Sequence, residues 1–223
     1  MNQLLFDFDT RSYPGFDKFL GTANAELVYV LQNQAAHGQF VYVWGAEGAG
    51  KSHLLQAWAA QATAAGATAA YVRAGQDPLT EAAFDTAYLA VDQVERLNGE
   101  EQALLFAVFN RFRNSGRGLL LLASEHPPQQ LAIREDLRTR LGYCLVYEAK
   151  PLTDEEKAAA LAETAAARQL AVSPEIFDYL LKHSRRDIGS LMKLFDALER
   201  QAVATGRRIT LPLVRETLKQ ETE

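Results

Sequence analysis

The sequence predicts a three-layer α/β domain with a five-stranded, mostly parallel sheet, followed by a small all-helical domain. Three observations lead to this fold class. Short β-rich runs alternate with longer helical stretches in roughly the first two thirds of the chain, a glycine-rich turn joins the first run to a helix, and helical patterns dominate after residue 151. Such alternation is typical of a parallel sheet covered by helices on both faces.

Five runs have the composition of buried strands. Several of them, such as VYV and LLLL, are apolar at successive positions, as expected for strands that are covered on both faces. The expected strands are residues 40–45, 69–74, 87–92, 118–124 and 144–149. Helical patterns separate most of these runs, at 51–65, 100–114 and 134–141.

A change of pattern at Pro151 marks the start of the helical domain. Thr153 and Glu156 have the spacing of a capping box, which predicts that a helix begins just after Thr153. Helices are expected at 154–169, 174–183, 187–204 and 212–220, with a short extended piece at 206–210. The expected domains are therefore an N-terminal peptide at 1–10, an α/β domain at 11–150 and a helical domain at 151–223.

Composition narrows the classes of function. The chain has 223 residues, a net charge of -5 and a pI near 5.5, which argues against binding nucleic acid through its overall charge. The single cysteine, Cys144, cannot form an internal disulfide, which fits a reducing compartment. No secretory signal is visible, and the most apolar run is far shorter than the roughly 20 residues that span a bilayer. We expect a cytoplasmic protein with no membrane partner.

The stretch GAEGAGKS, residues 45–52, matches the phosphate-loop pattern G-x-x-x-x-G-K-[ST] at every fixed position. It lies between an expected strand and an expected helix, which is the context that this pattern requires. Backbone N–H groups of such a loop close around phosphates, and the helix N-terminus favours anions. Lys51 would supply a cation to the phosphates, and the Ser52 hydroxyl would ligate Mg²⁺. The expected nucleotide-binding residues here are Gly45, Gly48, Ala49, Gly50, Lys51, Ser52 and His53.

Asp92 ends the expected strand at 87–92 and fits the carboxylate on the metal side of the same site. The next residue, where many nucleotide hydrolases place a second acid, is Gln93. An amide cannot act as a general base, although glutamine positions water in some phosphate-cleaving enzymes. Glu95 is expected to be solvated at an exposed helix start. The site is therefore expected to hold ADP or ATP with Mg²⁺ and to hydrolyse ATP slowly.

Five segments together resemble the AAA+ family, and within it the group formed by the replication initiator DnaA and its small relative Hda. YPGFDKFLGTANAELVYVL is similar to the opening segment, VWGAEGAGKSHLLQA to the phosphate loop, LLLLASEHPP to the sensor 1 strand, REDLRTRLGYCLVYEAKPLTDEEK to the arginine-finger segment, and HSRRDIGSLMKLFDAL to the sensor 2 helix. The resemblance implies that Ser124 or Glu125 faces the γ-phosphate, that Arg140 is an arginine finger, and that Arg186 lies over the phosphates. An arginine finger can be supplied in trans, by another protomer.

Two features favour the Hda group over the initiator. The sequence shows no helix-turn-helix module after the expected helical domain, and it is acidic, so we expect it to lack the initiator's means of reading DNA. In addition, the N-terminal sequence MNQLLFDF resembles the short peptides by which many proteins dock on the sliding clamp. The expected clamp-binding residues are Gln3, Leu4, Leu5, Phe6 and Phe8. The alternative for this stretch is a strand or flap that folds on the chain's own surface.

The resemblance implies an ADP-bound negative regulator of DNA replication initiation. It would dock on the DNA-loaded sliding clamp, the β subunit of DNA polymerase III, and promote ATP hydrolysis in ATP-bound DnaA through Arg140. DNA would be contacted only through the clamp, and a homodimer is left open. The alternatives are an AAA+ ATPase of the clamp-loader or helicase-loader type that hydrolyses its own ATP, a DNA-binding initiator paralogue, and a scaffold whose site stays empty.

Overall fold

The computed structural model describes residues 15–184, 187–206 and 208–220, and the chain divides into two compact units between Lys150 and Pro151. In the described part of the first unit, five strands form one sheet with the order β2-β3-β4-β1-β5, and all neighbouring strands run parallel. The strands are β1 (Val41–Trp44), β2 (Ala69–Arg73), β3 (Tyr88–Asp92), β4 (Leu119–Ser124) and β5 (Leu145–Glu148). All five predicted strands, and the parallel sheet, are confirmed.

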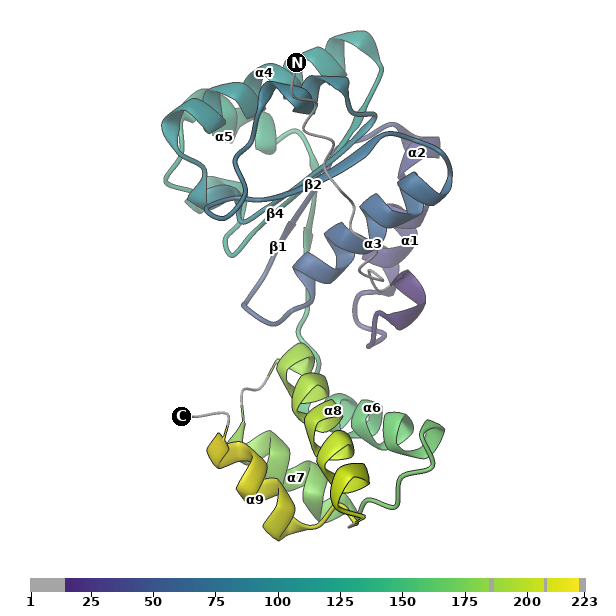
Figure 1. Ribbon diagram of the computed structural model, residues 1–223. Helices are drawn as coiled ribbons and strands as arrows, with labels where there is room; N and C mark the ends of the chain where they lie inside the picture. Colours follow the sequence, from purple (N-terminus) through teal and green to yellow (C-terminus); the bar gives the residue numbers. More distant parts are fainter. Residues whose placement is uncertain (1–14, 185–186, 207, 221–223) are drawn as a thin grey trace, which may run out of the picture. The chain divides into compact units, whose positions relative to one another are not determined.

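Helices cover both faces of this sheet and complete three layers (Figure 1). One face packs against α1 (Ala25–Gln32) and α3 (Lys51–Ala64), and the other packs against α4 (Gly99–Ser115) and α5 (Glu135–Leu141). Shorter helices lie in the connections: η1 (Phe16–Lys18), α2 (Gln34–His37), η2 (Glu81–Asp85), η3 (Val94–Arg96) and η4 (Pro128–Gln130). The helices predicted at 51–65, 100–114 and 134–141 are confirmed, whereas α1 and α2 were not predicted.

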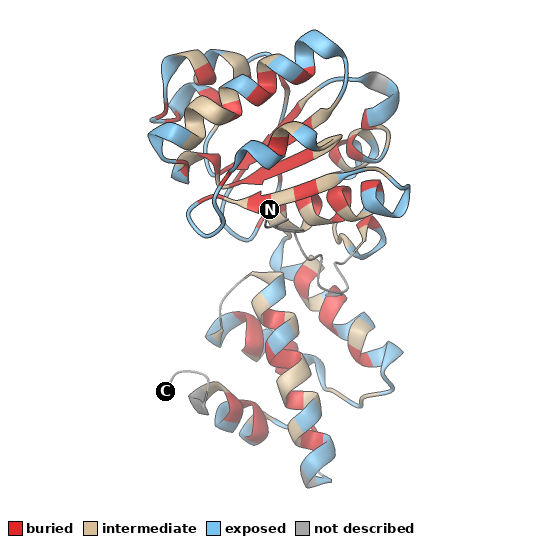
Figure 2. Ribbon diagram, turned by 45° about the horizontal axis from the view of Figure 1, so that its top comes forward, coloured by how far each residue is buried: buried red, intermediate tan, exposed pale blue. Residues whose placement is uncertain are grey.

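The central strands are buried on both sides, which explains their continuous apolar composition (Figure 2). Tyr42 and Leu122 belong to the core beneath α4 and α5, while their strand neighbours Val43 and Leu121 belong to the core beneath α1 and α3. Successive strand residues point to opposite faces, so a sheet that is covered twice needs apolar residues at both kinds of position. The two cores fix the sheet between its helical layers.

Four helices form the second unit among the residues described there: α6 (Asp154–Ala167), α7 (Pro174–His183), α8 (Ile188–Thr205) and α9 (Leu211–Gln220). The predicted capping box is present, because Thr153 Oγ1 accepts from the Glu156 N–H and the Glu156 carboxylate accepts from the Thr153 N–H. These helices enclose a core of their own, centred on Leu161, Leu180, Leu191 and Phe195. Residues 208–210, which were expected to be extended, lie in neither a helix nor a strand.

No helix in the described ranges has both the length and the apolar composition needed to cross a membrane.

A buried asparagine joins the start of α1 to the end of β5. Asn24 is 4% exposed; its Nδ2 donates to the Lys150 carbonyl oxygen at 2.8 Å, and its Oδ1 accepts from the Lys150 N–H at 2.8 Å. One side chain therefore satisfies both backbone groups of a residue 126 positions away. Backbone groups that lose their partners in a partly buried place cost free energy, so this pair holds the opening segment against the sheet.

We expect Asn24→Ala to lower the free energy of unfolding by about 1–3 kcal/mol, because it leaves both Lys150 backbone groups without this partner. Urea denaturation followed by tryptophan fluorescence measures the change. Asn33→Ala is the matched control, because Asn33 lies at the other end of α1 and its side chain donates to the nearby, exposed Tyr29 carbonyl. Its effect should stay within about 0.5 kcal/mol. Equal losses in the two variants would contradict this role of Asn24.

Candidate functional site

The glycine-rich turn between β1 and α3 has a backbone that requires glycine at two positions. Gly45 and Gly50 have φ angles of 155° and 86°. A Cβ on Gly45 would lie 2.5 Å from the Ala149 carbonyl oxygen, and a Cβ on Gly50 would lie 2.7 Å from the Phe19 ring. Gly48 and Ala49 lie between them in the same turn. The sequence pattern is thus matched by the loop shape that brings backbone N–H groups toward an anion.

Lys51, the first residue of α3, is 8% exposed, and its ammonium group folds back on the loop. Its Nζ donates to the carbonyl oxygens of Gly45, at 2.7 Å, and Ala46, at 2.9 Å. Burial lowers the pKa of Lys51, and the charges of nearby carboxylates, foremost that of Asp92, oppose this lowering. The two hydrogen-bond partners of this buried cation are neutral carbonyl oxygens. A phosphate bound in the loop would give the Lys51 ammonium group an anionic partner, which forms a stronger hydrogen bond.

Ser52 and Asp92 meet at the carboxyl edge of the sheet. The Ser52 hydroxyl donates to Asp92 Oδ2 at 2.6 Å, and the Tyr71 hydroxyl donates to the same oxygen at 2.9 Å. The Gln93 N–H donates to Asp92 Oδ1 at 3.0 Å, and Asp92 itself is 1% exposed. Three donors therefore hold the carboxylate in one orientation beside the hydroxyl.

The paired hydroxyl and carboxylate suit Mg²⁺, which takes oxygen ligands and usually keeps several waters and substrate phosphates in its shell. Across the described residues, no group of three His, Cys, Asp or Glu side chains is arranged to hold a metal ion. Ser52 and Asp92 would thus supply only part of a coordination shell. The remaining ligands fit a nucleotide's phosphate oxygens and water, so the residues present are compatible with a metal that arrives with nucleotide.

Ser124, at the end of β4, lies beside Trp44 in the neighbouring strand and is fully buried. Its Oγ accepts from the His126 N–H at 3.1 Å, which ties the hydroxyl into the turn that follows β4. Glu125 is exposed, and its charge is one of those that act on Lys51. Both residues of the expected sensor 1 pair therefore lie at the edge that carries the phosphate loop.

His53 is placed away from the pair formed by Ser52 and Asp92. Its Nε2 lies 3.1 Å from the Gly15 carbonyl oxygen, and its ring meets the Phe19 ring edge-on with centroids 5.4 Å apart. Burial lowers the pKa of His53. The same Phe19 ring lies against Gly50. His53 therefore connects the opening segment to the phosphate loop.

Arg140 lies in the last turn of α5, with its guanidinium carbon 5.7 Å from the centroid of the Phe106 ring. It is half-exposed. Arg186 and the expected clamp-binding residues Gln3, Leu4, Leu5, Phe6 and Phe8 lie outside the described residues.

The expectation that Glu95 is solvated at an exposed helix start is wrong. Glu95 lies within η3 and is half-buried, and its Oε2 is buried without a hydrogen-bond partner in the described structure. The cause is the backbone of Gln93, which has a φ of 57° and turns the chain sharply after β3. Gln93 Oε1 is also buried and unpartnered. Tyr71 was missed as well, because only the pairing of β2 with β3 brings it to Asp92.

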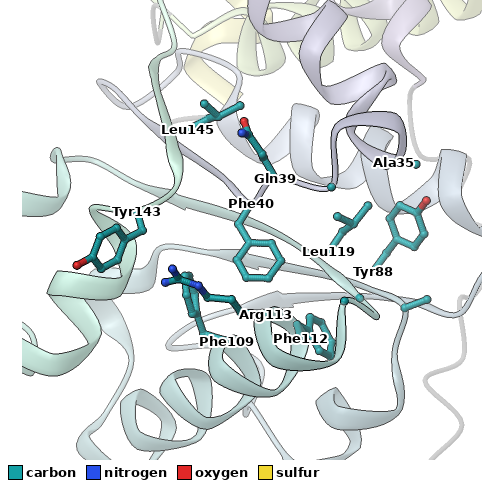
Figure 3. A pocket seen from close by; sticks show the side chains of 14 residues that line it. Ala35, Gln39, Phe40, Tyr88, Phe109, Phe112, Arg113, Leu119, Tyr143 and Leu145 are labelled. Atoms are coloured by element: carbon teal, nitrogen blue, oxygen red, sulfur yellow. The ribbon is translucent and has the colours of Figure 1, made fainter.

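A separate open pocket of about 550 Å³ lies at the opposite edge of the sheet, where the strands begin (Figure 3). Aromatic side chains, including Phe40, Tyr88 and Phe109, line it, and the Arg113 guanidinium lies 5.2 Å from the centroid of the Tyr143 ring. Its lining contains no predicted nucleotide-site residue. The predicted phosphate-loop residues lie instead at the carboxyl edge, which is where ligands usually bind in parallel α/β sheets.

Comparisons with known proteins agree with the fold of both units. The family model described as "Hda, lid domain" matches residues 154–218. Domain III of the replication initiation protein DnaA from Thermotoga maritima is 21% identical, with a TM-score of 0.76 over 92% of this chain and 95% of that one. AMPPCP-bound DnaA from Aquifex aeolicus is 24% identical, with a TM-score of 0.69 over 89% of this chain and 71% of that one.

A third match is protein NMB1076 from Neisseria meningitidis, whose solution structure is 67% identical to this chain. The match covers 68% of this chain and all of that one, with a TM-score of 0.47. The DnaA structures share the AAA+ fold of the first unit, and the lid model accounts for the helices of the second. The chain is therefore an Hda-like, DnaA-related AAA+ protein.

Proposed function

We propose that this chain is an ADP-bound regulator of replication initiation that docks on the DNA-loaded sliding clamp and stimulates ATP hydrolysis by DnaA. The family match and the DnaA-like fold support a DnaA-related replication regulator. The DnaA neighbour with bound AMPPCP supports an adenine nucleotide, with Mg²⁺, as the ligand of the phosphate loop here. In this proposal the nucleotide acts as a structural switch, and the reaction takes place in the partner's site.

The observation that carries the proposal is a phosphate loop joined to Asp92, with an amide in place of the second acid. Lys51 lies in the loop and Ser52 is paired with Asp92, so groups suited to phosphate and to part of a Mg²⁺ shell are present. Gln93 cannot take a proton from water as a carboxylate does. A site built in this way would bind a nucleotide but hydrolyse it slowly. Slow hydrolysis suits a regulator better than it suits a motor.

Arg140 is the residue that we assign to the partner's ATP. Its helix, α5, is separate from the phosphate loop, and its half-exposed guanidinium stacks over Phe106. Stacking on an aromatic ring holds a guanidinium in place without using its hydrogen-bond donors. Those donors remain for a phosphate on another protomer, where an arginine stabilises the charge that develops during hydrolysis.

Binding to the sliding clamp would bring this chain close to DnaA on the same DNA. Gln3, Leu4, Leu5, Phe6 and Phe8 combine an amide with large apolar side chains, which suits a short peptide that binds in an apolar pocket with one polar notch. Tethering to a clamp on DNA raises the local concentration of the regulator near DNA-bound DnaA without any new contact between the two proteins. The proposal therefore needs no direct DNA contact from this acidic chain.

Lys51→Ala should weaken ADP binding at least about tenfold, because it removes the buried cation from the phosphate loop. Equilibrium dialysis with labelled ADP and Mg²⁺ measures this loss. Lys150→Ala is the control, since the Lys150 side chain pairs with Glu148 on the exposed surface. If Lys51→Ala bound ADP as tightly as the wild-type chain, the nucleotide would not bind at the phosphate loop.

Arg140→Ala should reduce the stimulated hydrolysis of DnaA-bound ATP at least about a hundredfold, because the partner's transition state loses a cation. The assay follows labelled ATP preloaded on DnaA, with clamp, DNA and ADP present. Arg138→Ala, on the same helix, is the matched control and should retain stimulation. A chain that lacks residues 1–8 should stimulate only weakly. Full stimulation by Arg140→Ala, or by the shortened chain, contradicts the corresponding part of the proposal.

A further inference from the structure

We propose that Glu95, together with Gln93, makes the nucleotide site select ADP over ATP. This inference rests on the proposed nucleotide function and adds a specificity determinant to it. Both side chains follow β3 at the strand end that carries Asp92, and each has a buried acceptor oxygen. In this proposal, these acceptors and the Glu95 charge face the position that the third phosphate of ATP would take.

The turn after β3 places Glu95 at this edge. The strand ends at Asp92, and Gln93 follows with a φ of 57°, a conformation that few residues other than glycine adopt without strain. η3 then packs against β4, with Val94 fully buried. Glu95 follows Asp92, the metal-side carboxylate, by three positions in the sequence. Because η3 packs against the sheet, Glu95 is half-buried.

Electrostatics supports the same placement. The Glu95 charge acts on Lys51, the phosphate-loop cation, and also on Tyr42, whose hydroxyl donates to the His126 carbonyl just beyond β4. Burial is the larger influence on the pKa of both residues, and the carboxylate adds to it for Tyr42 and opposes it for Lys51. The Glu95 charge therefore acts on both the phosphate loop and the residue that reaches the turn after β4.

The two unpartnered acceptors, on Gln93 and Glu95, favour a hydrogen-bond donor beside them. Glu95 Oε2 and Gln93 Oε1 are buried, and neither has a hydrogen-bond donor in the described structure. Buried acceptors are normally satisfied, and only a group that carries hydrogen can satisfy them. Water carries hydrogen, whereas the oxygens of a terminal phosphate bound to Mg²⁺ are acceptors. ADP leaves the third position to water, while ATP fills it with a group that cannot donate.

The carboxylates near Lys51 also favour ADP over ATP. Four carboxylates act on Lys51 within the described structure, those of Asp92, Glu125, Glu95 and Glu47. Asp92 is committed to Ser52 and to the metal side. The third phosphate adds about one further negative charge beside the rest, and at the effective dielectric of a protein surface such repulsion changes affinity by about tenfold. Both effects weaken ATP more than ADP.

The test is to measure the affinities for ADP and for AMPPCP, an ATP analogue, by isothermal titration calorimetry with Mg²⁺. Wild-type chain should prefer ADP, and Glu95→Gln, which keeps the shape and removes the charge, should reduce that preference about fivefold to tenfold, mainly through tighter AMPPCP binding. Glu95→Ala should move the preference in the same direction. Glu81→Gln is the control, because it removes an exposed carboxylate from η2 and should leave the ratio unchanged.

The outcomes separate this inference from the proposed function. If wild type binds both nucleotides and neither Glu95 variant changes the ratio, the selection by Glu95 is wrong while the nucleotide site stands. If Glu95→Gln binds AMPPCP more weakly than wild type, Glu95 assists the third phosphate and the inference is overturned. If wild type binds neither nucleotide, the proposed nucleotide function itself fails, and this inference with it.

Discussion

The hydrogen bond between Ser52 and Asp92 is the contact on which the site depends. It joins the first turn of α3 to the end of β3 across 2.6 Å, and so connects the phosphate loop, which follows β1, to a strand two places away in the sheet. Because Asp92 also accepts from Tyr71 and from the Gln93 N–H, the carboxylate is fixed before any metal arrives. A site whose oxygen ligands are already oriented loses little conformational freedom on binding, which favours a firmly held nucleotide.

Charge is the reason that we propose a switch here and not a motor. Four carboxylates act on the buried Lys51, while the position after Asp92 carries an amide. In this proposal a diphosphate would give the buried cation an anionic partner, whereas a third phosphate would meet the unpartnered acceptors of Gln93 and Glu95. Slow turnover and preference for ADP would then both arise from the same three-residue turn. The chain's effect on replication would come from which nucleotide it holds and from what Arg140 contacts on a partner.

The sequence was sufficient for much of this structure, and the reasons for its failures are physical. Continuous apolar runs located the strands because a twice-covered sheet leaves no polar face, and the loop pattern located Lys51 and Ser52 because that backbone needs glycine at Gly45 and Gly50. Strand order is a long-range property, so nothing local indicated that Tyr71 would reach Asp92. Glu95 was mispredicted because the left-handed backbone of Gln93 is set by packing against β4 and has no signature in the sequence.

The most direct test of the central claim, that the nucleotide binds between the phosphate loop and Asp92, is a crystal structure of the chain with ADP and Mg²⁺. We expect Lys51 Nζ to exchange the carbonyl oxygens of Gly45 and Ala46 for the β-phosphate, Ser52 Oγ to ligate Mg²⁺, and Asp92 to hold a metal-bound water. Lys51 still bonded to both carbonyls, with ADP bound at another place, would contradict it.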